Sequence, residues 1–484
     1  MKGGGHMDHG TKREAIREHI KSAVLVLLFA LMILFSALYF VGTQSAMISP
    51  DLKMPLDRLL IIKKGDTESS LDVLDPSDHL PEMIAYRIGT DGGALVANRD
   101  LMRDFSRLFG EYYSYFFTSG STCGIVGRSE GETAWKQIID GESYLYVRYP
   151  GEIPYPLIYA FYTPDTTAAV HADGDITFIC ELLIDLDGGR AVSRDKIDTY
   201  AVFEREEADT QGSAFNLSAI SAYNENKSFS SFRMSSSEDA GYAFGIPIPE
   251  GDFSANLLLY ECADPTTLFA ASEARNSLLK MFDFNPDNPR SYDDNGSTVY
   301  IENHGTLILS PDGSITYEAS VGSGISLANV LGYSSYDGEY TMIEAMTAAC
   351  GLGRQLTELS PEIAGTAADL QLSRITSDDR EESAGIRFIF SYFCNNIPIS
   401  TGSEALSVTI EGNRITSVRL LMHSYTDTLI AESMLPLSWL ESNLFNLASV
   451  PNAKGRCMLT YSVITGEGEN RQIGCGWSYI RPES

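Results

Sequence analysis

The chain has 484 residues, of which 44% are hydrophobic and 10% aromatic, and its formal net charge is −30. This length predicts two or three domains, and the hydrophobic content is that of a globular protein rather than a disordered stalk. The strongly negative charge argues against nucleic-acid binding and against direct adhesion to anionic lipid or teichoic acid. Solubility is the simplest reason for this acidity.

Near the N-terminus, residues 22–41 form a run of twenty residues without a charge. A helix of this length rises about 30 Å, the thickness of the hydrocarbon core of a bilayer. Five basic residues precede the run, namely Lys2, Lys12, Arg13, Arg17 and Lys21. The positive-inside rule therefore predicts a cytoplasmic tail at 1–21, a single-pass transmembrane helix at 22–43 and an extracytoplasmic remainder, anchored in the cell membrane. A cleaved signal peptide is the alternative, but the apolar core is long for one.

The predicted span carries small residues on one stripe. Its alanines are spaced seven apart, and a larger apolar residue follows each alanine by four positions. Small residues on one stripe let a second helix approach closely in lipid. The predicted helix–helix interface consists of Ala23, Leu27, Ala30, Leu34, Ala37 and Val41. Chance alignment of three alanines is the alternative.

Beyond the span, strand and helix patterns alternate. Alternating apolar residues predict strands at 59–62, 144–149, 176–186, 200–204, 298–302, 306–310, 314–318, 370–375, 386–392, 406–410 and 415–424. Apolar faces and caps predict helices at 98–115, from Asp264, at 339–350 and from Pro436. We expect Asn98 to cap the first helix and Gly351 to end the third.

This mixture predicts an α+β fold with mostly antiparallel sheet, in which the transmembrane helix is followed by a multi-domain ectodomain. We divide the ectodomain into an N-terminal domain at 44–150, a central domain at 151–285 and a C-terminal domain at 286–484. The turn-rich stretch 285–296 supplies the second boundary.

Seven cysteines are scattered along the chain: Cys123, Cys180, Cys262, Cys350, Cys394, Cys457 and Cys475. Their odd number and the absence of any C-x-x-C argue against a disulfide framework, so buried free thiols are expected. The last two cysteines lie in a predicted hairpin of strands 456–465 and 471–480. In its register Cys475 faces Tyr461 and Cys457 lies near Tyr479, so these cysteines do not form a bridge.

Two short motifs match hydrolase signatures. Residues 127–131 read G-x-S-x-G around Ser129, but turn-like residues 118–122 precede them, where a nucleophile elbow needs a buried strand. Ser277 and Lys280 match S-x-x-K without the accompanying motifs, and a helix face explains them. We therefore predict no enzymatic activity and no catalytic residue.

The sequence also gives little evidence for a metal or cofactor site. Asp283, Asn285, Asp287 and Asp294 resemble positions of a calcium-binding loop, but its glycine and terminal glutamate are missing. The ectodomain histidines are far apart in sequence, at His79, His171, His304 and His423. A capped turn is the simpler reading of the acidic loop, so no metal or other cofactor is expected.

Several stretches carry a family resemblance. Residues 13–22 lead into the span, residues 281–290 read MFDFNPDNPR, and the strands at 297–303, 305–309 and 313–317 follow. Together with 144–160 they resemble the YycH (WalH) family, and residues 388–425 and 459–479 resemble the C-terminal domain shared by YycH, YycI and YpeB proteins. The chain departs from the pattern at His304, which lengthens a hairpin, and at residues 396–399, where Gly-x-Pro-Val is expected.

The resemblance implies a function. Proteins of the YycH family are single-pass accessory regulators of the YycG (WalK) sensor histidine kinase of Gram-positive bacteria, and they influence cell-wall metabolism together with YycI. It therefore implies two partners, a sensor kinase and a YycI-like membrane protein, with a homodimer as a further option. An extracytoplasmic ligand- or cell-wall-binding protein without a kinase partner is the alternative. A serine hydrolase using Ser129 is the third reading.

Overall fold

The computed structural model describes most of the chain from residue 78 onwards. The described residues are 74, 78–106, 121–162, 178–195, 199–205, 229–236, 244–250, 257–263, 272–331, 340–359, 367–378, 385–400, 404–431, 437, 456–465 and 470–480. The predicted span with its alanine stripe, the strand at 59–62 and the predicted helix starts at Asp264 and Pro436 lie outside them. In the described part of the chain, no helix is long and apolar enough to cross a membrane.

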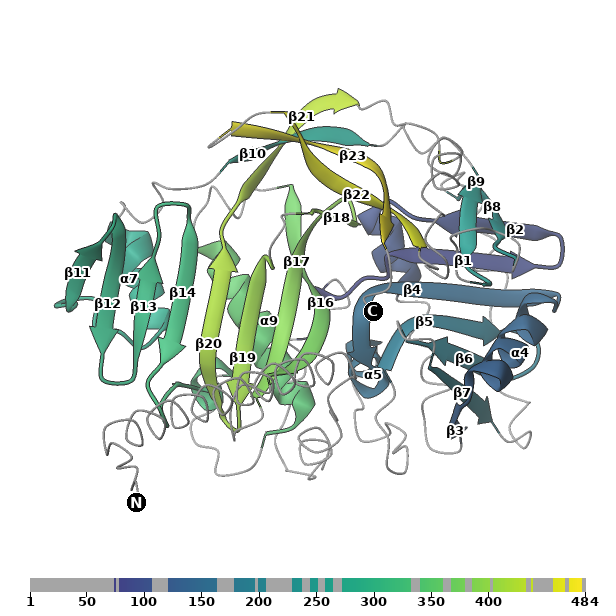
Figure 1. Cartoon of the computed structure of the whole chain (residues 1–484), viewed down its shortest axis with the longest axis horizontal. Helices are drawn as coiled ribbons and strands as arrows, with labels where there is room; N and C mark the ends of the chain where they lie inside the picture. Colours follow the sequence, from purple (N-terminus) through teal and green to yellow (C-terminus); the bar gives the residue numbers. More distant parts are fainter. Residues whose placement is uncertain are drawn as a thin grey trace, which may run out of the picture. The chain divides into compact units, whose positions relative to one another are not determined.

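One antiparallel sheet has seven strands in the order β2-β1-β4-β5-β6-β7-β3 (Figure 1). Their bounds are β1 Met83–Ile88, β2 Asp91–Leu95, β3 Ser121–Val126, β4 Ser143–Pro154, β5 Phe178–Asp185, β6 Arg190–Arg194 and β7 Tyr200–Arg205. Two helices accompany them, α4 at Arg128–Ile139 and α5 at Tyr155–Tyr162. β4 runs through the predicted boundary between residues 150 and 151, so that boundary falls inside a strand.

A second antiparallel sheet has ten strands, with the main order β11-β12-β13-β14-β20-β19-β17-β16. The bounds are β11 Ser291–Asp294, β12 Ser297–Glu302, β13 Gly305–Leu309, β14 Ser314–Ala319, β15 Ile325–Ser326, β16 Ala368–Asp378, β17 Gly385–Cys394, β18 Ile397–Pro398, β19 Leu406–Glu411 and β20 Arg414–Leu421. Its helices are α7 at Ser272–Met281, α8 at Leu327–Leu331 and α9 at Met342–Glu358. The predicted three-stranded run from residue 298 to 318 is therefore confirmed as β12–β14.

Two smaller sheets complete the described fold. The four-stranded sheet has the order β21-β10-β23-β22, and β8 pairs with β9. The bounds are β8 Ser231–Met234, β9 Pro247–Glu250, β10 Leu258–Ala263, β21 Ser424–Ala431, β22 Arg456–Thr465 and β23 Asn470–Ile480. The α+β fold with mostly antiparallel sheet is thus confirmed. The predicted strand 415–424 is wrong as one element, because β20 ends at Leu421 and β21 joins a different sheet.

Helix α9 differs from its predicted span at both ends. It begins after Thr341, whose side chain forms a capping box with Glu344, and it continues through Gly351 to Glu358. The prediction that Gly351 ends the helix is wrong, because Leu352 and Leu356 extend the buried face beyond it. Burial of two leucines outweighs the cost of about 1 kcal/mol for a glycine inside a helix.

The first helix begins where the sequence predicts. The side chain of Asn98 accepts a hydrogen bond from the backbone N–H of Leu101 at 3.1 Å, which is an N-cap contact. Residues 99–106 are helical, and the predicted continuation to 115 lies outside the described residues.

The first described segment, residues 78–82, is bound along its whole length to distant parts of the chain, and we call it the strap. Asp78 forms an ion pair with Arg354 of α9, with 3.2 Å between Nε and Oδ1. His79 is fully buried, its Nδ1 lies 2.8 Å from the carbonyl oxygen of Leu372 in β16, and its ring stacks on Tyr149 of β4. The strap therefore touches both large sheets within two residues.

The remaining strap residues continue this pattern. The backbone N–H of Leu80 donates to Gln371 of β16, and the side chain of Asn396 donates to the carbonyl oxygen of Pro81 at 2.7 Å. Glu82 forms a buried ion pair with Arg148 of β4, at 3.4 Å. Because buried polar groups need partners, this run of contacts fixes the strap against both sheets.

Candidate functional site

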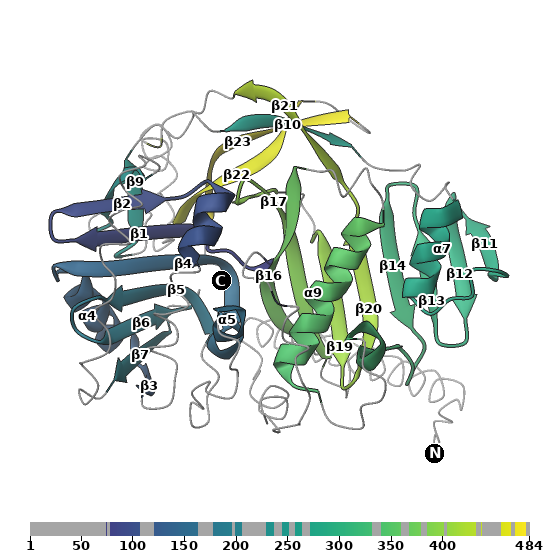
Figure 2. The same ribbon diagram turned by 180° about the vertical axis from the view of Figure 1, so that it is seen from behind.

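The two faces of the ten-stranded sheet are unlike each other. Figure 2 shows α7 and α9 lying in front of one face, and Figure 1 looks at the other face, where none of the labelled helices crosses the strands. Tyr317, Val408, Val418 and Phe388 are opposite one another in the ladder and are fully buried. They form the helix-covered side. We call the other side the open face.

Polar side chains form lateral rows on the open face. Arg387, Thr409, Ser417 and Glu318 are opposite one another on the consecutive strands β17, β19, β20 and β14. In the next row Ser407 of β19 is opposite Arg419 of β20, which is opposite Thr316 of β14. Residues directly opposite in an antiparallel ladder point to the same side of the sheet. The fold therefore gathers charges and hydroxyls from four strands.

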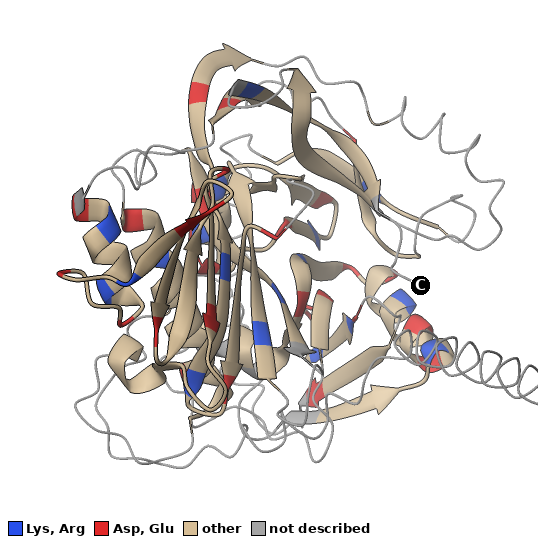
Figure 3. Ribbon diagram, turned by 60° about the vertical axis from the view of Figure 1, so that its left-hand side comes forward, with Lys and Arg blue, Asp and Glu red and all other residues tan. Residues whose placement is uncertain are grey.

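These rows form the floor of a cleft of about 690 Å³, and the loop after β14 borders it. The lining residues are residues 318–323 together with Arg387, Ser407, Thr409, Glu411, Arg414, Thr416, Ser417 and Arg419. Three arginines thus meet two glutamates and several hydroxyls, in a chain whose overall charge is −30. Figure 3 shows basic and acidic residues on the strands of this sheet.

Each charge in the cleft has a charged or polar neighbour. Arg419 forms an ion pair with Glu318 at 3.2 Å, and the hydroxyl of Ser417 donates to the same carboxylate at 3.1 Å. Arg387 pairs with Glu404 and also donates to the Ser407 hydroxyl at 3.2 Å. Partly exposed ion pairs of this kind contribute only about 0–1 kcal/mol each. A binding partner can therefore replace these contacts at low energetic cost.

Apolar side chains continue the same face away from the cleft. Ile301 lies in the row of Glu318, through Thr306, and Tyr292 lies in the row of Arg419, through Val299 and Ile308. Tyr292 and Ile301 are large hydrophobic residues exposed to solvent, and so is Val321 of the cleft loop. Aromatic residues and arginines are enriched at protein–protein interfaces.

The G-x-S-x-G motif has a structural explanation. Ser129 is the exposed second residue of α4, and strand β3 precedes it, so the prediction of a turn at residues 121–122 is wrong. β3 is an edge strand paired only with β7, whereas a nucleophile elbow follows a buried strand. Gly131 lies against the ring of Tyr200, where an added Cβ would come within 2.1 Å. This glycine serves the packing of α4 on the sheet.

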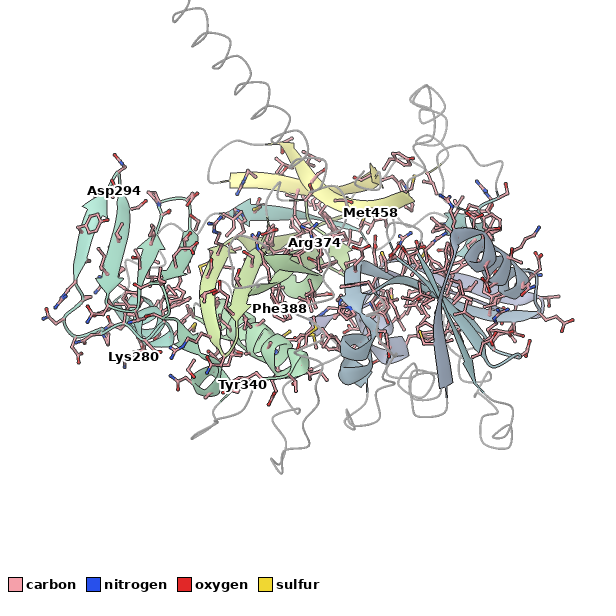
Figure 4. The ribbon with its side chains drawn as sticks, turned by 60° about the horizontal axis from the view of Figure 1, so that its bottom comes forward. Lys280, Asp294, Tyr340, Arg374, Phe388 and Met458 are labelled. Atoms are coloured by element: carbon pink, nitrogen blue, oxygen red, sulfur yellow. The ribbon has the colours of Figure 1, made fainter. Side chains whose placement is uncertain are left out.

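The other sequence motifs also fall on structural positions. Ser277 and Lys280 both lie exposed on α7. Asn285 accepts a hydrogen bond from the backbone N–H of Asp287 at 3.0 Å, which is the capped turn. Figure 4 shows Lys280 of α7 near one end of the β11–β12 hairpin and Asp294 at the other end. Asp294 therefore lies away from the acidic residues that follow α7. Within the described ranges, no group of three or more possible ligands could hold a metal ion.

The described histidines lie in separate environments. His79 contacts Leu372, His304 lies 3.1 Å from the carbonyl oxygen of Phe282, and His423 lies 3.2 Å from Arg471. His171 lies outside the described residues. The expectation that these histidines form no metal site therefore stays a prediction.

The structure tests the predictions made for the cysteines. All seven cysteines lie in the described residues, none of them forms a disulfide, and six are buried. The terminal hairpin has Cys475 opposite Tyr461 and Cys457 opposite Tyr479, the register that the sequence predicts. Burial raises the pKa of the Cys350 and Cys394 thiols, which keeps them protonated and unreactive.

Comparison of the chain with models of protein families, with curated proteins and with solved structures found no match. The resemblance to the YycH family therefore remains a prediction carried by the residues quoted above. Sequence reasoning missed the open face altogether. The only signal for it is the alternation of polar and apolar residues in β14, β19 and β20, which does not say that these strands are neighbours.

Proposed function

We propose that the chain is a membrane-anchored extracytoplasmic accessory regulator of a YycG (WalK)-like sensor histidine kinase, and that it acts by protein contact through the open face. The kinase and a YycI-like membrane protein are the proposed partners. The anchor is the predicted span at 22–43, with the N-terminus in the cytoplasm. Regulation of cell-wall metabolism is the proposed outcome, and no enzymatic step is part of the proposal.

One observation carries this proposal. The open face combines an arginine-containing cleft with exposed Tyr292 and Ile301 on the same sheet and with exposed Val321 on the loop that borders the cleft. A surface that presents an aromatic residue and arginines together, beside exposed apolar groups, suits a protein partner.

Site-specific photo-crosslinking in intact membranes tests the proposed contact. A photoreactive benzophenone amino acid replaces Val321 of the full chain, and the sensor kinase encoded in the same genome carries an affinity tag. Leu429 is the matched control, because both side chains are highly exposed, at 106% and 84%, and β21 belongs to another sheet. We expect the kinase to be crosslinked from position 321 and not from position 429. Equal crosslinking from both positions, or none from 321, would contradict the proposal.

The predicted span offers a second test. If Ala23, Ala30 and Ala37 pack against a partner helix, Ala30→Leu with Ala37→Leu should weaken association and leave insertion intact, because leucine is at least as apolar as alanine. In-membrane two-hybrid measurement reads this association. Unchanged pairing with every candidate helix would make the stripe a coincidence.

The alternative is an extracytoplasmic ligand- or cell-wall-binding protein. It has one observation in its favour, the cleft itself, but the cleft is lined by charges and hydroxyls rather than by the apolar walls typical of small-molecule sites. The hydrolase reading is tested separately. Labelling of Ser129 by a fluorophosphonate probe, lost in Ser129→Ala, would establish it.

A further inference from the structure

We propose that the cleft on the open face binds an extended acidic peptide segment, with carboxylates of the partner engaging Arg414 and Arg419. This inference rests on the proposed function and names the chemistry of the partner segment.

The arginines of the cleft have more donors than their described contacts use. A guanidinium carries five N–H donors in a planar fork that matches a carboxylate. Arg419 contacts Glu318, and Arg414 donates to the carbonyl oxygen of Gly324 at 3.2 Å. Both side chains are exposed to solvent. An incoming carboxylate can therefore be bound without breaking these contacts.

The acidic side chains of the cleft, in contrast, are already engaged. Glu318 accepts hydrogen bonds from Arg419 and Ser417, and Glu411 accepts one from Thr416 at 3.3 Å. Both carboxylates therefore accept hydrogen bonds from neighbours, and Glu318 is also paired with an arginine, while the exposed arginines have further donors. The balance favours an anionic ligand over a cationic one.

The layout of the floor favours an extended chain. Arg414 and Arg419 of β20 lie opposite Glu411 and Ser407 of β19, which are four residues apart, because β20 carries a bulge between the two arginines. Four residues correspond to about 14 Å along a strand. An extended peptide has the same rise per residue and its side chains alternate in direction, so it can place two carboxylates over both arginines when they are about four residues apart. The hydroxyls of Thr416 and Ser417 lie between these arginines and donate to Glu411 and Glu318, so each can still accept a hydrogen bond from a backbone N–H of the peptide.

The surroundings of the cleft favour a peptide over a glycan. Val321 on the cleft loop and Ile301 beside the floor are exposed and aliphatic, and Tyr292 extends this surface. Aliphatic groups offer contact to apolar side chains of a polypeptide. An acidic glycan is the competing ligand, and the experiment includes it.

The test measures binding of labelled decapeptides to the purified full chain in detergent, by fluorescence anisotropy. The probe alternates Glu and Thr, and the comparison peptides alternate Gln and Thr or Lys and Thr. Polygalacturonate fragments of similar length represent the acidic glycan. We expect binding of the Glu-Thr peptide, at least tenfold weaker binding of the other peptides and of the glycan, and a loss of affinity with rising salt.

Charge reversal on β20 locates the site. Arg419→Glu and Arg414→Glu should each weaken binding of the Glu-Thr peptide at least tenfold. Arg128→Glu is the matched control, because Arg128 and Arg419 are both 56% exposed and each pairs with one glutamate, Glu132 or Glu318. Arg128→Glu should leave the affinity within twofold of the parent. Circular dichroism of each variant confirms that it is folded.

Three results would overturn the inference: no binding of the Glu-Thr peptide at millimolar concentration, equal binding of the Gln-Thr peptide or the glycan, or an equal effect of Arg128→Glu. If the peptide fails while Val321 still crosslinks to the kinase, the acidic-segment inference is wrong and the proposed function stands. If the peptide binds through Arg419 and no kinase is crosslinked, the proposed function is wrong and the peptide site stands.

Discussion

The two large sheets use the same kind of ion pair in opposite ways. In the seven-stranded sheet Arg194 and Glu181 are buried, and Tyr146 donates to the same carboxylate at 3.0 Å. On the open face of the ten-stranded sheet, Arg419 and Glu318 are about half exposed. The buried pair is enclosed by protein groups and holds the sheet together. The exposed pair leaves donors available, which is what recognition of a partner requires.

The largest expected effect comes from breaking the buried pair. Glu181→Ala leaves the Arg194 guanidinium buried without its carboxylate, beside the carbonyl oxygen of Phe244, the ring of Trp135 and the side chain of Tyr200. We expect a loss of about 3–5 kcal/mol in the free energy of unfolding. Urea denaturation followed by circular dichroism measures it. A loss below about 1 kcal/mol would show that the two sheets use their ion pairs alike.

The second prediction concerns His79 in the strap. Burial lowers the pKa of His79 from 6.5 to about 4, although its contact with the Leu372 carbonyl oxygen opposes this. Between these values the unfolded chain binds the extra proton and the folded chain does not, so stability is retained above pH 6.5 and falls as the pH drops towards 4. The loss at pH 4 is about 3 kcal/mol. Urea midpoints of the parent and of His79→Gln over this range measure it, and parallel pH profiles would contradict it.

The third prediction tests the close approach of the two sheets. Gly151 of β4 lies so near β16 that an added Cβ would come within 1.8 Å of the carbonyl oxygen of Ser373. Gly151→Ala should therefore cost about 1–3 kcal/mol. Gly124→Ala in β3 is the control, because nothing lies within 4 Å of its Cβ position. Thermal unfolding compares the two variants, and equal melting temperatures would show that β4 can move away from β16 at no cost.

The smallest effect is expected from the exposed pair. Glu318→Ala removes the partner of Arg419, and both side chains keep contact with water, so we expect a change below about 1 kcal/mol in stability. The same urea assay measures it beside Glu181→Ala. A loss as large as that of Glu181→Ala would mean that the open face is part of the structural framework.

Local features of the fold could be predicted from the sequence. The register of the terminal hairpin follows from alternation and a short turn, and it places Cys475 opposite Tyr461 as expected. The Asn98 cap is also predictable from the sequence, because an N-cap contact joins residues only three positions apart. Helix α9 was misjudged because tertiary burial of Leu352 and Leu356 decides its length rather than Gly351.

The candidate site could not be predicted, because it depends on strand order. Arg387, Ser417 and Glu318 share one row because β14, β20, β19 and β17 are neighbours in the sheet. β14 and β20 are separated by about a hundred residues of sequence. Alternation within one strand tells which residues share a side, but not which strand lies beside it. The same reason hides the partners of the strap.

The contacts of the strap have a consequence for the order of events during synthesis. Arg354, Gln371, Leu372 and Asn396 follow their strap partners by 276 to 315 residues. At a synthesis rate of about 5–20 residues per second, the strap is made roughly 15 to 60 s before Asn396 exists. A nascent chain that does not yet include Asn396 cannot form all the contacts of the strap. Closing it is therefore a late step of folding, and it joins the beginning of the described fold to strands made about 300 residues later.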